Sequence, residues 1–403
     1  MARELRTAAG DRAPVAHPES LRRQIRGWEH GEHRPDERYR TLYAVVFDVP
    51  EHELFAGTDA APTLAVEESA KLASLADVPR VEDVLARVVS GTGRRVGAGT
   101  VVALESRVHA LRLADDVVPG GELVEPAFRQ LDQAVSLYRD SSHREDVGRA
   151  MLGVLAELAQ VAGWIAADAG QAARAASTYR LGLSAAREAG DPALESNLIG
   201  SLAYLTTNGP TPDAALDLAQ AAVELANRSA SPRARALAWD RMAWAQARVG
   251  VTGLATRALG EAATALTEAG PAPERPWLYW VSAGESQVME ARAYTELRRP
   301  LRAIPVLARV LDAYDTSHAR ELALYLSWLA VAFADAREPE AAAATAGRMF
   351  DLSDGMASHR TAERARTVLS RLSPYRADVP EVAELWERHR ASTTEHTPTA
   401  PSA

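Results

Sequence analysis

Between residues 162 and 354 the sequence repeats one plan five times: an apolar helical stretch, a tight turn, and a second helix with small residues near its start. The copies align on one alanine each, at spacings of 39, 40, 48 and 39 residues: Ala176, Ala215, Ala255, Ala303 and Ala342. A single helical hairpin leaves its apolar face open to water, so neighbouring copies must stack to bury it. The repeat therefore predicts an α-solenoid, a row of packed helical hairpins.

The composition favours an all-α fold. Alanine and leucine are strong helix formers and are abundant, and 47% hydrophobic residues in a chain of 403 suffice for a sizeable core. There is no cysteine, which excludes a disulfide framework, a thiolate metal site and a cysteine nucleophile. The best apolar run, residues 322–334, is too short to span a membrane, and the first ten residues lack the apolar core of a signal peptide. We expect a cytoplasmic protein with no membrane contact.

The sequence pattern divides the chain into four parts. Residues 1–57 form a small unit, residues 58–99 a helical linker, residues 100–390 the repeat region, and residues 391–403 a polar tail that we expect to be disordered. The whole chain carries a net charge of −9, whereas residues 1–40 hold nine arginines and seven acidic residues. An anionic partner is therefore expected at the front of the chain.

The front unit contains a short amphipathic helix, expected over residues 19–29. At about 100° per residue, Leu21, Ile25 and Trp28 form one narrow apolar seam. The polar side chains point away from this seam: Ser20, Arg22, Arg23, Gln24 and Arg26. Gly31 and Pro35 end the helix. A second amphipathic helix follows, and residues 49–55 form a turn or short helix.

A helix with this polar face suits the major groove of DNA. Arginine pairs bidentately with guanine and glutamine with adenine, and both side chains also bind phosphates. His33 or Arg34, in the turn that follows, would add a phosphate contact. The alternative is a solvated charged helix with no partner.

The same segment resembles part of a known DNA-binding domain. The matching residues are Ser20, Ile25, Arg26, Trp28, Glu29, Gly31 and Pro35, followed by Tyr39, Leu42 and the ending VFDVPEHELF. This order is similar to the second half of the helix-turn-helix domain of Cro/phage-repressor-type regulators, the XRE family. The resemblance covers about residues 18–56 and implies that Ser20 starts the recognition helix, whose remaining polar residues face DNA.

The resemblance also implies a truncation. The family domain has two helices before the recognition helix, whereas residues 1–17 supply only one, with Leu5 and Ala9 as its apolar residues. The seam of Leu21, Ile25 and Trp28 is then expected to be partly uncovered. Three explanations stay open: a start further upstream, a partner or the repeat region covering the seam, or a loss of DNA binding.

The repeats are similar to tetratricopeptide (TPR) repeats in the order of Ala175, Tyr179 and Leu183, although their pitch exceeds the 34 residues of that family. A front DNA-binding unit followed by TPR-like helices resembles XRE-family regulators of high-GC Gram-positive bacteria. That likeness implies a C-terminal domain that senses a peptide or small molecule and forms a homodimer.

Aromatic and polar side chains in the repeats mark a candidate ligand site, because a solenoid offers a concave groove. The candidate residues are Trp239, Arg241, Trp244, Trp280, Gln287 and Tyr294. The alternative is that these side chains only pack between helices.

Motifs of catalysis are absent from the sequence. The glycine-rich stretch 91–97 has neither the spacing of a dinucleotide loop nor the Lys-Ser/Thr of a P-loop. Asp115 and Asp116 are adjacent, so they point apart on a helix, and we expect them at a solvated helix end. His30 and His33 are the only close histidine pair and flank a turn. We therefore expect no enzyme, no catalytic residue, no cofactor and no metal.

Two hypotheses remain. In the first, the protein is a transcriptional regulator that binds double-stranded DNA as a homodimer and responds to an unknown peptide or small-molecule effector. In the second, it is a TPR-like interaction scaffold that has lost DNA binding.

Overall fold

The computed structural model describes residues 2–9, 17–29, 35–47, 95–118, 120–209, 211–270, 274–312, 314, 319–353 and 359–395. Within these ranges every regular element is an α-helix or a 3-10 helix, apart from one isolated β-bridge between Arg95 and Ser142. The all-α prediction is confirmed. The segments predicted at 49–55, 64–76 and 80–89 lie outside the described residues.

Three helices make up the front unit: α1 (Ala2–Ala9), α2 (Pro18–Glu29) and α3 (Glu37–Phe47). They share a small apolar core formed by Leu5, Ala9, Leu21, Ile25, Tyr39 and Leu42. Asp36 precedes α3, and its carboxylate accepts a hydrogen bond from the Tyr39 amide at 3.1 Å, which stabilises the first turn of α3.

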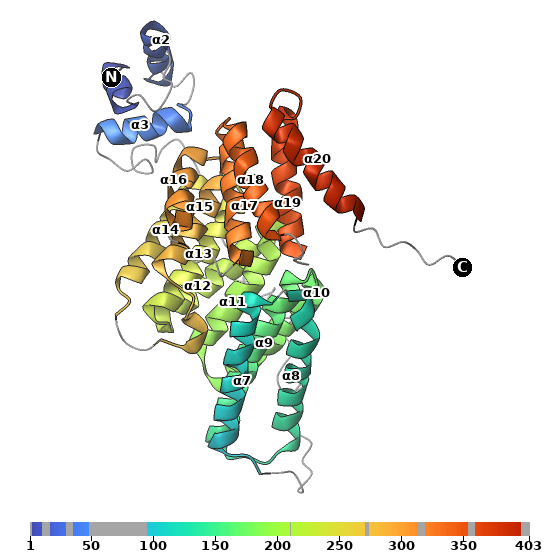
Figure 1. Ribbon diagram of the computed structural model, residues 1–403. Coiled ribbons are helices and arrows are strands. Elements are labelled where there is room, and N and C mark those ends of the chain that lie inside the picture. Colours follow the sequence, from blue (N-terminus) through green and yellow to red (C-terminus); the bar gives the residue numbers. More distant parts are fainter. Residues whose placement is uncertain are drawn as a thin grey trace.

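The remaining helices form consecutive hairpins (Figure 1). The pairs are α7 (Ala98–Val117) with α8 (Gly120–Asp140), α9 (Glu145–Asp168) with α10 (Ala172–Ala189), α11 (Pro192–Thr207) with α12 (Leu216–Ser229), α13 (Pro232–Arg248) with α14 (Thr252–Thr267), α15 (Ala283–Glu296) with α16 (Pro300–Asp312), α17 (Ala319–Asp335) with α18 (Pro339–Ser353), and α19 (His359–Leu372) with α20 (Pro380–Glu395). Short 3-10 turns lie between some of them: η2 (Pro212–Ala215), η3 (Pro276–Leu278) and η4 (Ser373–Tyr375).

The first helices of successive hairpins pack against one another in chain order. α7 contacts α9, α9 contacts α11, and the series continues through α13, α15 and α17 to α19. Figure 1 shows the same order, with the colours passing along the hairpins from cyan to red. Side chains on the first helices of neighbouring hairpins can therefore meet although they lie some 40 residues apart in the sequence.

Four of the hairpins turn through the same backbone conformation. The turn residues Gly170, Gly250, Arg298 and Arg337 have φ angles of 79°, 81°, 57° and 63°. In each turn the following amide donates to the carbonyl five residues before it, as Gln171 does to Ala166. Glycine adopts a left-handed φ without strain, whereas arginine does so at a cost. The same left-handed turn conformation thus occurs with glycine in two hairpins and with arginine in two others.

Small residues let the two helices of each hairpin approach closely. Ala215, Ala255, Ala303 and Ala342 are fully buried, as the alignment predicts. In the first copy the fully buried alanine is Ala175, not Ala176, because Ala175 lies on the same stripe as Tyr179 and Leu183. The predicted alignment is therefore wrong by one residue in that copy.

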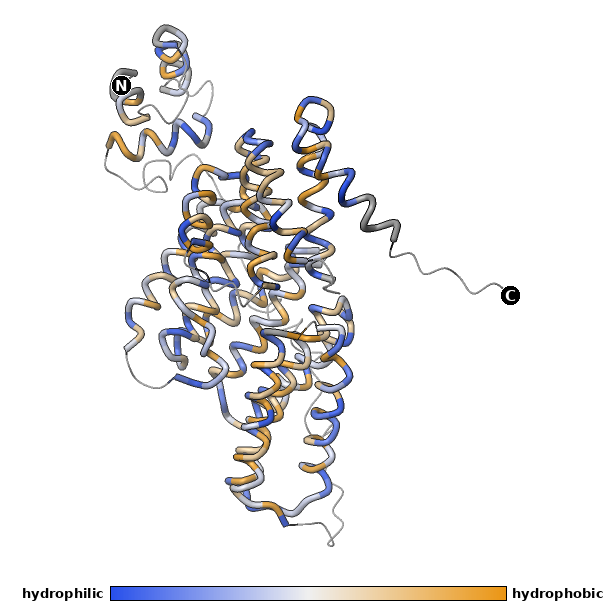
Figure 2. The backbone as a smooth tube through the Cα atoms, in the orientation of Figure 1, coloured by the Kyte–Doolittle hydropathy of each residue, from blue (hydrophilic) through white to orange (hydrophobic). Residues whose placement is uncertain are grey.

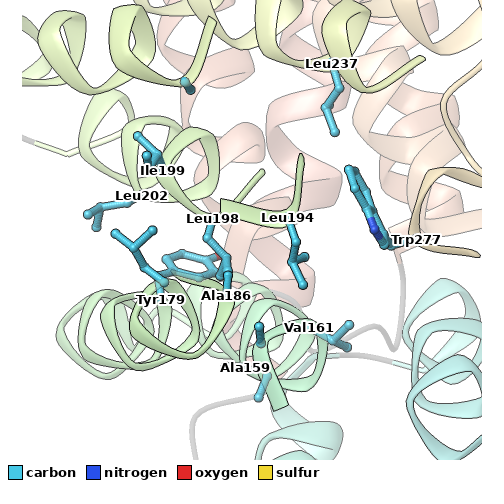
Figure 3. Close-up of a cluster of buried hydrophobic side chains, with 14 of the residues drawn as sticks. Ala159, Val161, Tyr179, Ala186, Leu194, Leu198, Ile199, Leu202, Leu237 and Trp277 are labelled. Carbon is cyan, nitrogen blue, oxygen red and sulfur yellow. The ribbon is translucent and has the colours of Figure 1, made fainter. Parts of the chain in front are cut away.

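The interface of α9 and α10 shows how tight this packing is. A Cβ added at Gly163 would lie 2.5 Å from Cε1 of Tyr179, so only glycine fits against this ring. Tyr179 is 1% exposed and lies beside Ala186 and Leu198 in the apolar cluster of Figure 3. Residues on α9 and α11 thus bury the aromatic ring of α10 from both sides.

Helix α9 is long and apolar over most of its length. Its length and composition would suit a membrane span, but 67% of its apolar window is buried inside the fold. In Figure 2 hydrophobic and hydrophilic residues alternate along the helices of the hairpins. α9 is thus placed as a core helix.

Two predicted boundaries shift. Helix α7 begins at Ala98, inside the segment predicted as linker, where Arg95 pairs with Ser142. Helix α20 ends at Glu395, inside the segment predicted as tail. Residues 396–403 lie outside the described part of the chain.

Candidate functional site

The structure describes three of the predicted DNA contacts. Arg22 and Gln24 are exposed on α2, and Ser20 is half-buried at the start of the helix. The side chains of Arg23 and Arg26, and all of His33 and Arg34, lie outside the described part of the chain.

The apolar seam of α2 is closed at two of its three residues. Leu21 is 0% exposed and Ile25 is 5% exposed, because α1 and α3 pack on them and Leu5 of α1 is itself fully buried. The expectation of a partly uncovered seam is wrong for these two residues. Trp28 is half-buried, and its ring lies 4.8 Å from that of Tyr39. The three helices therefore hold the polar face of α2 on a packed base.

The predicted ligand residues have different surroundings. Trp239 is half-buried against the main core, Trp280 is 39% exposed beyond η3, and Gln287 is half-buried on α15. Tyr294 is buried and its hydroxyl accepts from Arg302 at 3.3 Å.

Arg241 is a structural residue. It is 5% exposed, and its guanidinium donates to the backbone oxygen and the side-chain oxygen of Asn197 at 2.8 and 2.9 Å. The gap beside it, between α11 and α13, has no room for a water molecule. Burial lowers the pKa of Arg241 to about 10, so the side chain is charged at neutral pH. It ties α13 to α11.

One predicted residue, Trp244, belongs to a group that crosses five successive hairpins. We call this group the aromatic–arginine cluster: Tyr204 of α11, Trp244 of α13, Arg292 of α15, Trp328 of α17 and Arg364 of α19. Each of these helices is the first of its hairpin and contributes one side chain. The regular packing of first helices is what brings together residues from positions 204 to 364.

The contacts in this cluster are of rings with guanidinium groups. The guanidinium carbon of Arg292 lies 4.8 Å from the centroid of Trp244, 5.3 Å from that of Trp328 and 5.8 Å from that of Tyr204. The guanidinium carbon of Arg364 stacks on Trp328 at 3.5 Å. The two indole rings meet edge to face with their centroids 5.6 Å apart. Cation–π attraction of this kind is worth about 0.5–2 kcal/mol per pair.

Neither arginine of the cluster has a carboxylate partner among the described residues. Arg292 donates to the Tyr204 hydroxyl at 2.7 Å and to the sulfur of Met289, and Arg364 donates to the Ser327 hydroxyl at 2.9 Å. The Nε atom of Arg292 and the Nη2 atom of Arg364 are buried without a hydrogen-bond partner. An unmet buried donor costs about 1–3 kcal/mol, and more on a charged group.

Burial, followed by the like charge of Arg292, lowers the pKa of Arg364 to about 9. The side chain is still protonated at neutral pH, so two positive charges share one aromatic surface. Burial disfavours ionisation of Tyr204, but Arg292 and Arg360 outweigh it and lower the pKa of the phenol. The field at the cluster is therefore positive.

An aromatic pair extends the cluster towards α9. The rings of Trp164 and Tyr204 stack with their centroids 5.5 Å apart, and both residues are half-buried. The guanidinium carbon of Arg360 lies 5.9 Å from the Trp164 centroid. Half-exposed, flat apolar surface thus borders the positive charge.

A second charged group lies next to the first, and we call it the paired-charge cluster: Asp115, Asp168, Arg320 and Arg360. Asp168 is 5% exposed and meets Arg360 at 3.1 Å and Arg320 at 3.6 Å. Arg320 also lies 3.9 Å from the Asp115 carboxylate and donates to the backbone oxygens of Asp115 and Val118. The end of α7 and the start of α17 are thereby joined.

Asp115 is not at a solvated helix end, and that prediction is wrong. α17 covers it, and burial is the main reason that its pKa rises to about 7 despite the attraction of Arg320. Asp116 does point the other way, as predicted, and accepts a hydrogen bond from the Tyr279 hydroxyl at 2.8 Å.

Sequence reasoning missed most of the aromatic–arginine cluster. Arg364 and Arg360 are four residues apart, as are Trp164 and Asp168, so each pair shares a helix face. That spacing was the available signal. It could not show which distant helix the face meets.

Other hollows carry less chemistry. A hollow with a volume of about 440 Å³ lies open along α8 and is lined by Asp132, Gln133, Ser136, Leu137, Asp140 and Ser141. It presents neither an aromatic ring nor an arginine. The aromatic–arginine cluster and the polar face of α2 are therefore the two candidate sites.

No protein-family model matches the chain, and no curated protein matches it at a significant level.

Proposed function

We propose that the protein is a DNA-binding transcriptional regulator of the helix-turn-helix type. The observation that carries the proposal is the two-sided character of α2. Leu21 and Ile25 are buried in the front unit, while Arg22 and Gln24 on the same helix are exposed. A packed apolar seam flanked by exposed arginine and glutamine side chains is what a helix needs to enter the major groove.

The hairpin stack would then be an α-solenoid of TPR-like repeats that senses a peptide or small molecule. Regulation is a coupling free energy: an effector that favours one geometry of the stack changes the affinity for DNA, and DNA changes the affinity for the effector equally. We propose a homodimer because one short helix makes few base contacts and helix-turn-helix proteins pair across two half-sites.

The test is binding of the full chain to duplex DNA in a salt series, with the sequence selected from a randomised pool. We expect log affinity to fall linearly with log salt, with a slope of about −0.9 per phosphate contacted. Arg22→Ala and Gln24→Ala should each weaken the selected site by about 1–3 kcal/mol. Arg107→Ala, an exposed arginine on α7, is the control and should leave binding unchanged. A chain that binds no duplex even in dilute buffer overturns the proposal.

The second candidate is an interaction scaffold without DNA binding. Tyr279 and Trp280 favour it: they are 40% and 39% exposed, while the preceding Trp277 and Leu278 are buried. Exposed aromatic side chains on a fixed base are enriched in protein interfaces. In the same experiment a scaffold shows no DNA binding, and Trp280→Ala should abolish capture of a protein partner.

A further inference from the structure

Arg292 and Arg364 form no ion pair with a carboxylate within the described part of the chain. Two carboxylates attract Arg364 without pairing with it: Glu296 is engaged with Arg248 at 2.6 Å, and Glu363, the preceding residue on α19, is exposed to solvent. Asp168 is engaged with Arg360 and Arg320. Two like charges held on one ring repel each other more strongly in a protein interior than in water. An anion placed at these guanidinium groups would remove that repulsion.

The aromatic surface beside the arginines fits a flat apolar body. Trp164 of α9 and Tyr204 of α11 are stacked and half-exposed, and Arg292 of α15 reaches Tyr204 with a hydrogen bond at 2.7 Å. Offset stacking on such rings is favourable for another aromatic group. The charged part and the apolar part are connected through Tyr204, whose hydroxyl accepts from Arg292.

We propose that the aromatic–arginine cluster binds a small organic anion, a carboxylate attached to a flat apolar body. The carboxylate would pair with Arg292 and Arg364, because a planar guanidinium matches a carboxylate with two parallel hydrogen bonds. The apolar body would lie on Trp164 and Tyr204. This inference rests on the sensor role proposed for the hairpin stack, and it names the chemical class of the effector.

The arrangement distinguishes this ligand from simpler ones. Inorganic phosphate could meet the arginines but would leave the Trp164–Tyr204 surface unused. An uncharged aromatic compound would use that surface but would leave both charges unpaired. The preference should therefore require both halves of the ligand.

The experiment is isothermal titration of the full chain with three probes: naphthalene-2-carboxylate, its amide, and inorganic phosphate. We expect the carboxylate to bind at least tenfold more tightly than the amide or phosphate, and to quench tryptophan fluorescence. Equal affinity for carboxylate and amide would show that the arginines do not select charge. Equal affinity for phosphate would show that the rings do not contribute. Either result overturns the proposal, as does the absence of binding.

Variants locate the probe within the protein. Arg364→Gln and Arg292→Gln should each weaken carboxylate binding about tenfold and leave the amide unaffected. Trp164→Leu should weaken the carboxylate and the amide alike. The control is Arg366→Gln, two residues from Arg364 on α19 and exposed, which should change neither. If Arg364→Gln loses its cooperative unfolding transition, Arg292→Gln and Trp164→Leu decide the outcome.

The result is separable from the regulator proposal. Binding of the carboxylate with no DNA binding refutes the regulator and keeps the anion site. DNA binding with no carboxylate binding does the reverse. If both occur, a saturating concentration of the probe should shift the affinity for the selected duplex, and Arg364→Gln should remove that shift.

Discussion

Two neighbouring groups of arginines on the first helices of the hairpins differ in what neutralises them. In the paired-charge cluster, Arg320 and Arg360 meet Asp168, which is almost fully buried. In the aromatic–arginine cluster, Arg292 and Arg364 meet rings and hydroxyl groups but no carboxylate among the described residues. The comparison indicates that the same residue type fixes helices in one place and leaves charge available in the other.

This difference predicts opposite responses to mutation. Removing one partner of a buried ion pair leaves the other charge uncompensated, which is strongly destabilising. Removing a charge that has no partner removes its hydrogen bonds, but it also removes the unfavourable free energy of burying an unpaired charge. Mutations that change the free energy of unfolding can therefore tell the two clusters apart.

The largest effect is expected for Asp168→Ala. This change leaves Arg320 and Arg360 without their shared carboxylate and should lower the free energy of unfolding by about 3–5 kcal/mol. Denaturant unfolding followed by helical circular dichroism measures it. Asp146→Ala, whose side chain is 64% exposed and pairs with an exposed arginine, is the control and should leave the free energy of unfolding almost unchanged. Equal losses in the two variants would contradict the distinction.

A pH-dependent effect follows from Asp115. Because burial raises its pKa from 3.8 to about 7, the folded state holds a proton that the unfolded state releases between these values. The resulting stabilisation is fully present below pH 3.8 and is lost as the pH rises through 7. Relative to Asp115→Asn, the native chain should lose about 2–4 kcal/mol between pH 4 and pH 8.

Unfolding curves of both proteins at matched pH values test this expectation. The asparagine variant keeps a neutral side chain throughout, so only the native chain should show the decline. A difference in unfolding free energy that does not vary with pH would place the titration elsewhere.

The smallest effect is expected for Arg364→Met. This substitution keeps much of the packing on Trp328 and removes a positive charge that repels Arg292, so it should change the free energy of unfolding by about 1 kcal/mol or less. The matched change on the paired side, Arg320→Met, leaves Asp168 with Arg360 alone and removes the hydrogen bonds to the backbone oxygens of Asp115 and Val118, so it should cost several times more. Similar losses for the two variants would mean that Arg364 is as tightly bound into the fold as Arg320.

Helix positions were predictable from the sequence because they depend on local periodicity. The five hairpins between residues 162 and 354 are present, and Gly170 and Gly250 lie at their turns. The turns at Arg298 and Arg337 were harder to foresee, since arginine rarely takes a positive φ. At these two turns the sequence pattern indicates where the helices end, but an arginine gives no sign that the backbone takes a left-handed conformation.

The candidate sites depend on contacts between distant residues, and the sequence showed little of them. Trp244 was predicted and lies in the aromatic–arginine cluster, whereas Arg241 is turned to Asn197 and serves packing. Nothing local to Arg364 or Trp164 says that residues 200 positions apart will face the same surface. Only the order in which the first helices pack decides this.

The contact of Arg320 with Val118 spans 202 positions of the chain. In a row of repeats where each unit touches only its neighbours, the ends fray independently and the row can melt piecewise. The Arg320–Val118 contact joins the first hairpin, α7 with α8, to the hairpin of α17 and α18. The hairpins between them are therefore expected to unfold together and not one by one. Deleting one central hairpin would move Arg320 away from Val118. This chain should therefore tolerate changes in repeat number less well than a repeat protein without such a long-range contact.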